Sequence, residues 1–367
     1  MTDQAPDVPV SDTPALDLLG FGRFRAAFTG YAGVGIEPGR VVRTIRGHVW
    51  VALTAGVTRV SPAGNIAGGD RDAAHPVVGD WVAVRTGDAD SPSVVEALLP
   101  RHSAFVRGDP GKAAVGQVLA ANIDIVFIVD GLDRGPNLRR IERELALAWE
   151  SGAKPVVVLS KADLSEDTAA AIAAVAAIAP GVDVVLESAA TGAGLVDLLA
   201  YADGNQTVAL IGPSGVGKST LVNRLVGGDI QRVGEVRAFD GKGRHTTVAR
   251  ELVPLPTGGV LVDTPGLRAV AMWDDDEGVD TTFAEISDLA ADCKFDDCSH
   301  ENEPGCAVLA ALEAGTLDRA RYDAYMALRK ESVLAGRDSA ARMRAAESRS
   351  KKIAKDSRAY FRDHGRE

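Results

Sequence analysis

The chain has 367 residues, more than a single hydrophobic core usually supports, so we expect several domains. Its formal net charge of -11 excludes a protein that is attracted to nucleic acid over its whole surface. The small number of cysteines excludes a disulfide-stapled secreted fold, and the lack of a long apolar run excludes a membrane-spanning one. We therefore expect a soluble, cytoplasmic protein without membrane contact.

The first 19 residues are rich in proline and aspartate, which predicts a disordered leader over residues 1–19. An OB-type β-barrel is predicted over residues 20–105, with a purely structural barrel of SH3 type as the alternative. Trp50 and Trp81 could stack on bases there, although aromatic residues in small barrels more often belong to the core. The barrel prediction rests on five short β-rich runs, separated by glycine and proline: Val41–Ile45, Val49–Thr54, Val57–Ser61, Asp80–Arg85 and Val94–Leu99.

A central α/β domain is predicted over residues 106–275, and its first half carries two loops that resemble the guanine-reading loops of GTPases. Ser160, Lys161 and Asp163 follow an apolar run and resemble the motif N-K-x-D. Asp163 would accept from guanine N1 and N2, a pattern that adenine cannot offer. Ser188 and Ala189 follow a second apolar run and resemble the short loop whose backbone N–H contacts guanine O6.

A phosphate-binding loop follows the apolar run Thr207–Ile211 and matches G-x-x-x-x-G-K-[ST]. Its glycines let backbone N–H groups surround phosphates, Lys218 can neutralise the β and γ oxygens, and the Ser219 hydroxyl can ligate Mg²⁺. A merely structural glycine turn is the weaker alternative. The candidate phosphate-contacting residues are Gly212, Pro213, Ser214, Gly215, Val216, Gly217, Lys218, Ser219 and Thr220.

Downstream, a buried strand ends in D-x-x-G, with Asp263 placed to hold Mg²⁺ together with Ser219 and with Gly266 placed to sense the γ-phosphate. The base-reading loops thus precede the phosphate loop, whereas ordinary small GTPases begin with it. This order indicates a circularly permuted P-loop GTPase domain, which tolerates permutation if its original termini lie close together.

Gly243-Arg-His-Thr-Thr247 resembles the switch I region of GTPases, which would offer Thr246 and Thr247 as nucleotide or Mg²⁺ contacts. Leu267 stands where many GTPases place a water-orienting glutamine, so basal turnover should be slow. His245 is our candidate for orienting or deprotonating the attacking water, and a surface histidine in a mobile loop is the alternative.

The C-terminal region, residues 276–367, is predicted to be an α-helical zinc-binding domain with a basic tail. Three cysteines and one histidine are spaced C-x₄-C-x-H-x₅-C, which suits a closed tetrahedral Zn²⁺ site of structural type; three free cysteines are the alternative. From residue 319 onward the chain carries 14 Lys and Arg against 7 Asp and Glu. This basic tail could dock on RNA, and a solvent-exposed charged helix is the alternative. The candidate zinc ligands are Cys293, Cys298, His300 and Cys306.

These motifs together resemble the ribosome small-subunit-dependent GTPase A (RsgA) family. The resemblance includes Val78-Gly-Asp-Trp-Val82 in the barrel and Glu303-Pro-Gly-Cys306 at the zinc site, and it runs from about Arg40 to Tyr325. It implies an OB-fold, a permuted GTPase and a zinc domain, GTP hydrolysis stimulated by the small ribosomal subunit, and a late role in maturation of that subunit. Ser160 departs from the family's usual asparagine, which puts loop rigidity and guanine affinity in doubt.

The leading hypothesis is therefore a GTPase that binds GTP and GDP with Mg²⁺, carries one structural Zn²⁺, contacts the small subunit and its rRNA, and is a monomer. A GTP-controlled switch that binds another RNA is a second hypothesis. A P-loop phosphotransferase is a third, disfavoured because no acceptor-site motif is visible.

Overall fold

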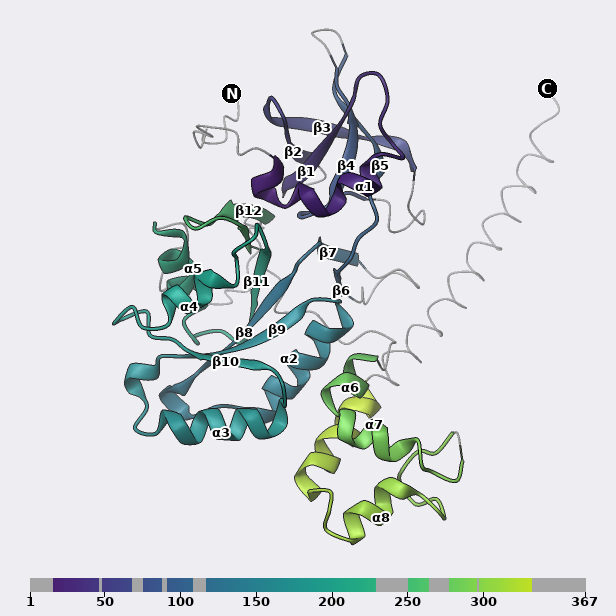
Figure 1. Ribbon diagram of the computed structural model, residues 1–367, viewed down its shortest axis with the longest axis vertical. Helices are drawn as coiled ribbons and strands as arrows, with labels where there is room; N and C mark the ends of the chain where they lie inside the picture. Colours follow the sequence, from purple (N-terminus) through teal and green to yellow (C-terminus); the bar gives the residue numbers. More distant parts are fainter. Residues whose placement is uncertain are drawn as a thin grey trace, which may run out of the picture. The chain divides into compact units, whose positions relative to one another are not determined.

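The computed structural model describes residues 16–45, 48–67, 75–87, 91–107, 117–228, 250–263, 277–295 and 297–331. Two compact units make up the chain, one of Met1–Phe105 with Val118–Ala269 and the other of Val106–Gln117 with Val270–Glu367. The first unit contains the barrel and the nucleotide-binding sheet, and the second contains the cysteine-rich module (Figure 1). The predicted boundaries at 105/106 and 275/276 stay predictions.

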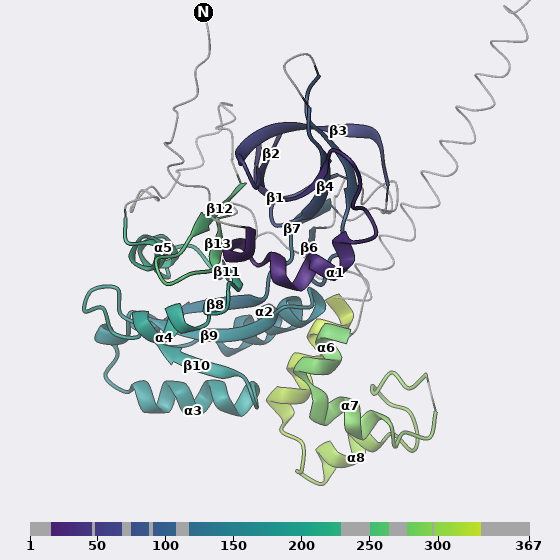
Figure 2. The ribbon, with the colours of Figure 1, turned by 45° about the horizontal axis from the view of Figure 1, so that its top comes forward.

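The barrel consists of five strands that close into a ring (Figure 2). They pair in the order β1-β2-β3-β5-β4, and β4 returns to pair with the first half of β1. Alternate side chains point inward, as the period of two along a strand requires, and nine aliphatic residues fill the interior. The five predicted strands and the OB-type barrel are confirmed. The strands are β1 (Ile36–Ile45), β2 (His48–Leu53), β3 (Gly56–Ala67), β4 (Trp81–Arg85) and β5 (Val94–Leu98).

Short helical turns at the start of the described chain cover one part of the barrel's outer face: η1 (Leu16–Leu19), η2 (Phe21–Phe24) and α1 (Arg25–Phe28). Trp81 is fully buried beneath them, with its ring centroid 5.5 Å from that of Phe24 in a stacked arrangement. Leu16 and Leu19 are buried too, so the last four residues assigned to the disordered leader are part of the fold, and the first 15 lie outside the described residues. The possibility that Trp81 stacks on a base is therefore wrong.

The nucleotide-binding sheet has the strand order β10-β9-β8-β11-β13-β12, in which all strands but the last run parallel. In the sheet, β11 lies between β8 and β13. Along the chain it is the fourth of the five parallel strands, after β8, β9 and β10. This is the arrangement that a circular permutation of a P-loop GTPase produces, as predicted. The strands are β8 (Ile125–Gly131), β9 (Lys154–Ser160), β10 (Asp183–Leu186), β11 (Thr207–Ile211), β12 (Arg250–Pro254) and β13 (Val260–Asp263).

Helices cover both faces of this sheet, with α2 and α3 on one side and α4 and α5 on the other (Figure 1). Because the central strands are buried on both faces, they read as continuous apolar runs, of which Ile125–Gly131 is fully buried. The helical elements are η3 (Leu132–Arg134), α2 (Leu138–Glu150), η4 (Ala162–Leu164), α3 (Thr168–Ile178), α4 (Leu195–Ala200) and α5 (Lys218–Val226).

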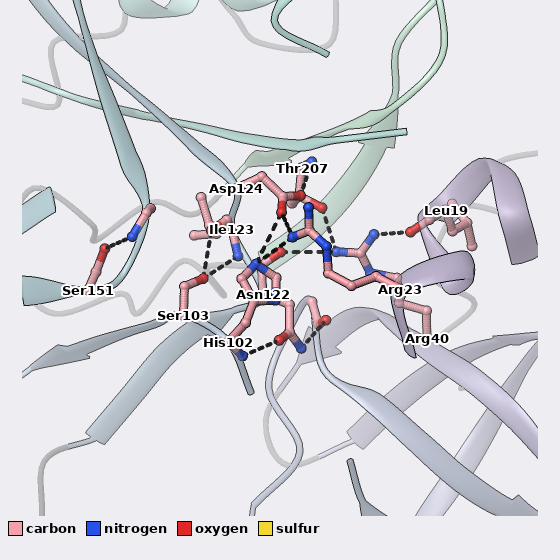
Figure 3. A network of polar contacts seen from close by, with 12 residues as sticks. Leu19, Arg23, Arg40, His102, Ser103, Asn122, Ile123, Asp124, Ser151 and Thr207 are labelled. Atoms are coloured by element: carbon pink, nitrogen blue, oxygen red, sulfur yellow. Dashed lines mark hydrogen bonds and ion pairs between the residues drawn. The ribbon is translucent and has the colours of Figure 1, made fainter. Parts of the chain in front are cut away.

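Backbone pairing joins the barrel to the nucleotide-binding sheet, because β1 pairs antiparallel with β12. A buried polar network adds to this joint at the amino ends of β8 and β11 (Figure 3). Arg40, which is 1% exposed, donates to the Thr207 hydroxyl at 2.7 Å, and Asp124 accepts from the Thr207 N–H at 2.8 Å. The polar network therefore lies at the opposite end of the parallel strands from the ligand loops, and it helps to fix the barrel to the sheet without occupying the site.

In the second unit, the described part of the C-terminal region, residues 277–295 and 297–331, is built of helices and connecting loops, as predicted. Its helices are α6 (Glu277–Thr282), α7 (Ala284–Ala290), α8 (Ala307–Glu313) and one over residues 319–331. Phe283 is fully buried, with the Arg321 guanidinium 4.1 Å from its ring centroid. β6 (Ala104–Arg107) and β7 (Gln117–Ala121), whose residues are divided between the two units, form a separate two-stranded sheet. Among the described residues, no helix has both the length and the apolarity needed to cross a membrane.

Candidate functional site

The phosphate loop connects β11 to α5 and has the backbone that the motif requires. Gly212, Gly215 and Gly217 all have positive φ angles, of 135°, 85° and 98°. A Cβ on Gly212 would lie 2.3 Å from the carbonyl oxygen of Val129, so this position admits glycine alone. Directly after β11, the loop therefore passes close to the backbone of β8. It opens at the carboxyl edge of the sheet, where ligands bind in open α/β folds.

Lys218 is the first residue of α5, and its side chain folds back over the loop. Its ammonium group donates to the carbonyl oxygen of Gly212 at 2.6 Å and also to that of Pro213. Only 8% of the residue is exposed. A phosphate group would offer this ammonium charge-assisted bonds in exchange for the bonds to neutral carbonyls.

The two predicted base-reading loops lie together at the same edge. Asp163, after β9, accepts a hydrogen bond from the Ser188 hydroxyl, after β10. The buried Ser160 hydroxyl donates to the carbonyl oxygen of Val216 at 2.6 Å and lies 3.2 Å from that of Asp130. Ser160 therefore ties the base-reading loop to the phosphate loop, so the loop has a support even without the longer asparagine.

A cavity of about 650 Å³ opens beside the phosphate loop, lined by residues 130, 131 and 133–140, by Lys161 and by residues 213–216. Lys161 is held there by Asp133, whose carboxylate lies 3.1 Å from the ammonium, and the lysine lowers the pKa of that carboxyl group. Arg140 pairs with the buried Asp130 at the wall of this cavity. The cavity is large enough for a nucleotide-sized ligand.

Two carboxyl groups near the loops, those of the buried Glu187 and the half-buried Glu144, were not identified from the sequence. Burial, followed by the nearby Asp163, raises the pKa of Glu187 to about 7. Burial likewise raises the pKa of Glu144, on α2, to about 7, although nearby Arg140 opposes this. One carboxylate oxygen of each has no hydrogen-bond partner among the described residues. A glutamate just before a short S-A loop carries no signal of burial in the sequence alone.

Glu187→Gln is expected to reduce the loss of stability between pH 5 and pH 8. The folded-state pKa of about 7 lies above the ordinary 4.5, so the folded state binds more protons in this range and its stability falls as the pH rises. Because the glutamine stays neutral, the free energy of unfolding of the variant should fall by on the order of 2–3 kcal/mol less than that of the wild type between pH 5 and pH 8. Urea unfolding of both proteins at several pH values measures it, and parallel curves for the two would contradict the assignment.

Other predicted site residues are placed less fully. Asp263 ends β13 next to Glu251 of β12, at the same edge of the sheet as the phosphate loop. Ser219 and Thr220 lie in the first turn of α5, and Ala189 follows Ser188. The described residues do not include His245, Thr246, Thr247, Gly266 or Leu267.

The four predicted zinc ligands converge in the second unit, with their ligand atoms all within 4.8 Å of one another. His300 Nδ1 lies 3.6 Å from Cys293 Sγ and 3.5 Å from Cys306 Sγ, and the two sulfurs are 3.8 Å apart. A tetrahedral Zn²⁺ with bonds of about 2.3 Å to sulfur and 2.0–2.1 Å to nitrogen needs about these separations. The thiols are free rather than disulfide-bonded, and the donor set fits a closed structural site.

The surrounding chain holds these ligands in place. The Tyr322 hydroxyl donates to the carbonyl oxygen of His300 at 2.7 Å, while His300 itself has a left-handed backbone, φ 60°. The Glu303 carboxylate accepts from the backbone N–H groups of Ser299, Glu301 and Asn302 and so closes the loop between the ligands. Such supporting contacts orient ligands before a metal binds.

Sequence comparison identifies relatives over most of the chain. Residues 98–273 match the profile described as RsgA GTPase. A protein of Streptomyces coelicolor, named small ribosomal subunit biogenesis GTPase RsgA, is 48% identical over 322 residues, or 86% of each chain. The chain belongs to the RsgA GTPase family. A second RsgA, from Syntrophotalea carbinolica, is 41% identical over 93% of this chain and 96% of its own.

Solved structures agree with this RsgA assignment. YjeQ from Thermotoga maritima superimposes with a TM-score of 0.61 at 28% identity, over 81% of this chain and 99% of its own. The structure titled YloQ, a circularly permuted GTPase, gives a TM-score of 0.58 at 24% identity, over 81% of this chain and 95% of its own, and supports the fold. The resemblance predicted from the motifs is confirmed.

Proposed function

We propose that this protein hydrolyses GTP to GDP and phosphate and acts as a late assembly factor in the biogenesis of the small ribosomal subunit. The observation that carries the proposal is the meeting of two loop types at one sheet edge. The Asp163–Ser188 pair suits guanine, the loop of Lys218 suits phosphates, and Ser160 joins them. The relatives named for small-subunit biogenesis supply the biological setting.

In the proposed site, Asp163 selects guanine, and the backbone N–H of Ala189 is proposed to donate to guanine O6. Lys218 and the backbone N–H groups of residues 212–219 bind the phosphates. The Ser219 hydroxyl and Asp263 would hold Mg²⁺, which supplies charge neutralisation on the β and γ phosphates. Gly266, Thr246 and Thr247 are proposed to sense the γ-phosphate and the metal.

The cysteine-histidine cluster is proposed to hold one structural Zn²⁺. Three thiolates and one imidazole complete a tetrahedral shell and leave no position for a substrate, so the metal would stabilise the module and take no part in hydrolysis. The protein is further proposed to be a cytoplasmic monomer whose partners are the small subunit and its rRNA.

GTP turnover with and without purified small ribosomal subunits tests the proposal. We expect slow basal hydrolysis and strong stimulation by the subunit, because Leu267 cannot orient water and a bound partner can order the catalytic loop. His245→Ala should keep GTP affinity and lose most of the stimulated rate. His75 is an exposed histidine of the barrel, and His75→Ala should keep both the GTP affinity and the stimulated rate.

The outcomes separate the hypotheses. Stimulation by unrelated RNA alone would favour the GTP-controlled RNA switch. No stimulation by the subunit would remove the proposed role, and a wild-type stimulated rate in His245→Ala would show that this histidine is not catalytic.

A further inference from the structure

A second cavity lies in the first unit, where the barrel meets the nucleotide-binding sheet. Its volume is about 280 Å³, and its lining includes Arg40, Trp81, His102, Asp124 and Thr207. Thr207 begins β11 and Asp124 directly precedes β8, whereas the phosphate loop follows the other end of β11. The cavity is therefore separate from the proposed nucleotide site, and we call it the joint cavity.

Arg40 and Trp81 are among the most deeply buried residues that line the joint cavity, at 1% and 0% exposure. They stand opposite each other on β1 and β4, so their side chains leave the barrel on the same face. The Arg40 guanidinium lies 5.4 Å from the Trp81 ring centroid. Two buried side chains with N–H donors thus lie side by side at the cavity wall.

Each of these two residues has one N–H group, Arg40 Nε or Trp81 Nε1, without a hydrogen-bond partner among the described residues. The other N–H groups of Arg40 are in use. One Nη group donates to the carbonyl oxygen of Leu19, and the other donates to the Thr207 hydroxyl and lies 3.4 Å from the carbonyl oxygen of Asn122. A buried donor without an acceptor is destabilising, and more so when it is charged. The pair points to an acceptor that this chain does not itself supply.

The Arg40 guanidinium also has no carboxylate partner among the described residues, since all its acceptors are neutral. Burial lowers the pKa of Arg40 to about 10, although Asp124 and Asp80 oppose this from a distance. Figure 3 shows the Asp124 carboxylate turned to Arg23 and His102. The surroundings of Arg40 therefore hold one unmatched buried positive charge. Each of three nearby arginines has a carboxylate of its own: Arg23 with Asp124, Arg25 with Asp17 and Arg101 with Asp80.

We propose that the joint cavity binds a small oxyanion, the carboxylate or phosphate group of a metabolite, which accepts from Arg40 Nε and Trp81 Nε1. An oxyanion offers several lone pairs to the two N–H groups and supplies the negative charge that Arg40 lacks. A cation would meet the charge of Arg40, and an apolar ligand would leave both donors unpaired. The volume lies near the lower end of the range typical of small-molecule sites.

The rim of the joint cavity favours the same ligand. Arg23 lines the cavity and is exposed, so an anion entering from solvent meets a guanidinium first. Asp124 repels an anion less than a free carboxylate would, because it pairs with Arg23 and accepts from the Thr207 N–H at 2.8 Å.

Calorimetric titration of the full-length protein with inorganic phosphate and, separately, with succinate tests the proposal. GDP and Mg²⁺ are kept saturating so that the phosphate loop is occupied, and sodium chloride at the same ionic strength is the control for salt. The heat of binding is measured instead of the melting temperature, because phosphate stabilises proteins without binding to them. We expect saturable binding of an oxyanion and none of chloride. Tighter binding of phosphate or of succinate assigns the ligand to phosphates or to carboxylates.

Trp81→Phe should weaken oxyanion binding roughly 10-fold, because it removes an N–H donor to a charged acceptor and keeps an aromatic ring. Arg23→Gln should weaken it by about 2- to 5-fold, since it removes a partly solvated charge. Trp50→Phe and Arg59→Gln make the same changes at barrel residues that do not line the joint cavity, and both should bind as the wild type does. Unchanged GDP binding shows that each variant is folded.

Lys218→Ala, titrated without nucleotide, separates the joint cavity from the phosphate loop. Its oxyanion binding should persist, and loss of binding in this variant would assign the anion to the nucleotide site and overturn the proposal. Absence of saturable binding to the wild type at millimolar concentrations would also overturn it, as would equal affinities of Trp81→Phe and Trp50→Phe. If Trp81→Phe does not fold, the comparison of Arg23→Gln with Arg59→Gln decides in its place, and equal affinities of those two would count against the site.

Discussion

Asp163→Asn is expected to weaken GTP binding by on the order of 100-fold and to shift preference toward xanthosine triphosphate. The carboxylate accepts from both N–H groups on the guanine edge, whereas an asparagine presents one donor to them. Xanthine carries a carbonyl oxygen where guanine has its amine, so the asparagine can donate to it. Calorimetry or a fluorescent nucleotide assay with GTP, XTP and ATP measures the change.

Asp167→Asn is the matched control for this substitution. It removes the same charge four residues later, at the N-cap of α3, where asparagine caps as well as aspartate does. The Asp163 variant can still bond to the Ser188 hydroxyl, so the loops should keep their geometry. Equal affinity of the wild-type protein for ATP and GTP would refute the assignment of Asp163 to base recognition.

Local patterns in the sequence were sufficient to predict the strands and the ligand loops. The run Thr207–Ile211 is β11 to the residue, because a strand buried on both faces is apolar throughout and a glycine must follow it where the loop crosses Val129. The zinc ligands were predictable for a similar reason, since their spacing sets which atoms can converge.

Contacts between distant segments could not be predicted in this way. Nothing in either strand indicates that β1 pairs with β12, because pairing depends on where the barrel is fixed. The doubt raised by Ser160 disappears only when its hydroxyl is seen to reach Val216, 56 positions away. Glu187 looks like an ordinary surface residue until the fold buries it beside Asp163.

The exposure of the two barrel tryptophans, Trp50 and Trp81, could not be predicted from local sequence patterns either. Trp50 lies between the core residues Val49 and Val51, and Trp81 directly precedes the core residue Val82, so both tryptophans point away from the barrel interior and periodicity treats them alike. Trp81 is buried because the turns of residues 16–28 cover it, and Trp50 stays accessible because no described element does. Which tryptophan ring is accessible to solvent is therefore decided by a segment that lies far away in the sequence.

Purified protein is expected to contain about one zinc per chain, and Cys298→Ala should lose the metal and much of the stability of the second unit. Zinc binding to such a donor set contributes on the order of 10 kcal/mol to folding of small zinc modules, so losing one of three thiolates has a large effect. Nucleotide binding should remain nearly intact, because the phosphate loop and Asp163 belong to the first unit. Metal analysis and thermal unfolding with and without a chelator measure both.

Val308→Ala distinguishes the loss of metal from general damage to this module. Val308 is fully buried on α8, two residues after Cys306, and its truncation leaves a cavity that should cost about 1–3 kcal/mol whether or not zinc is bound. This variant should keep its zinc, and a chelator should lower its melting temperature further, as in the wild type. Cys298→Ala should melt at the same low temperature with or without the chelator, since it has little zinc to lose. If the wild-type protein purified without chelators contains no zinc, or if a chelator does not lower its melting temperature, the cluster serves packing and not metal binding.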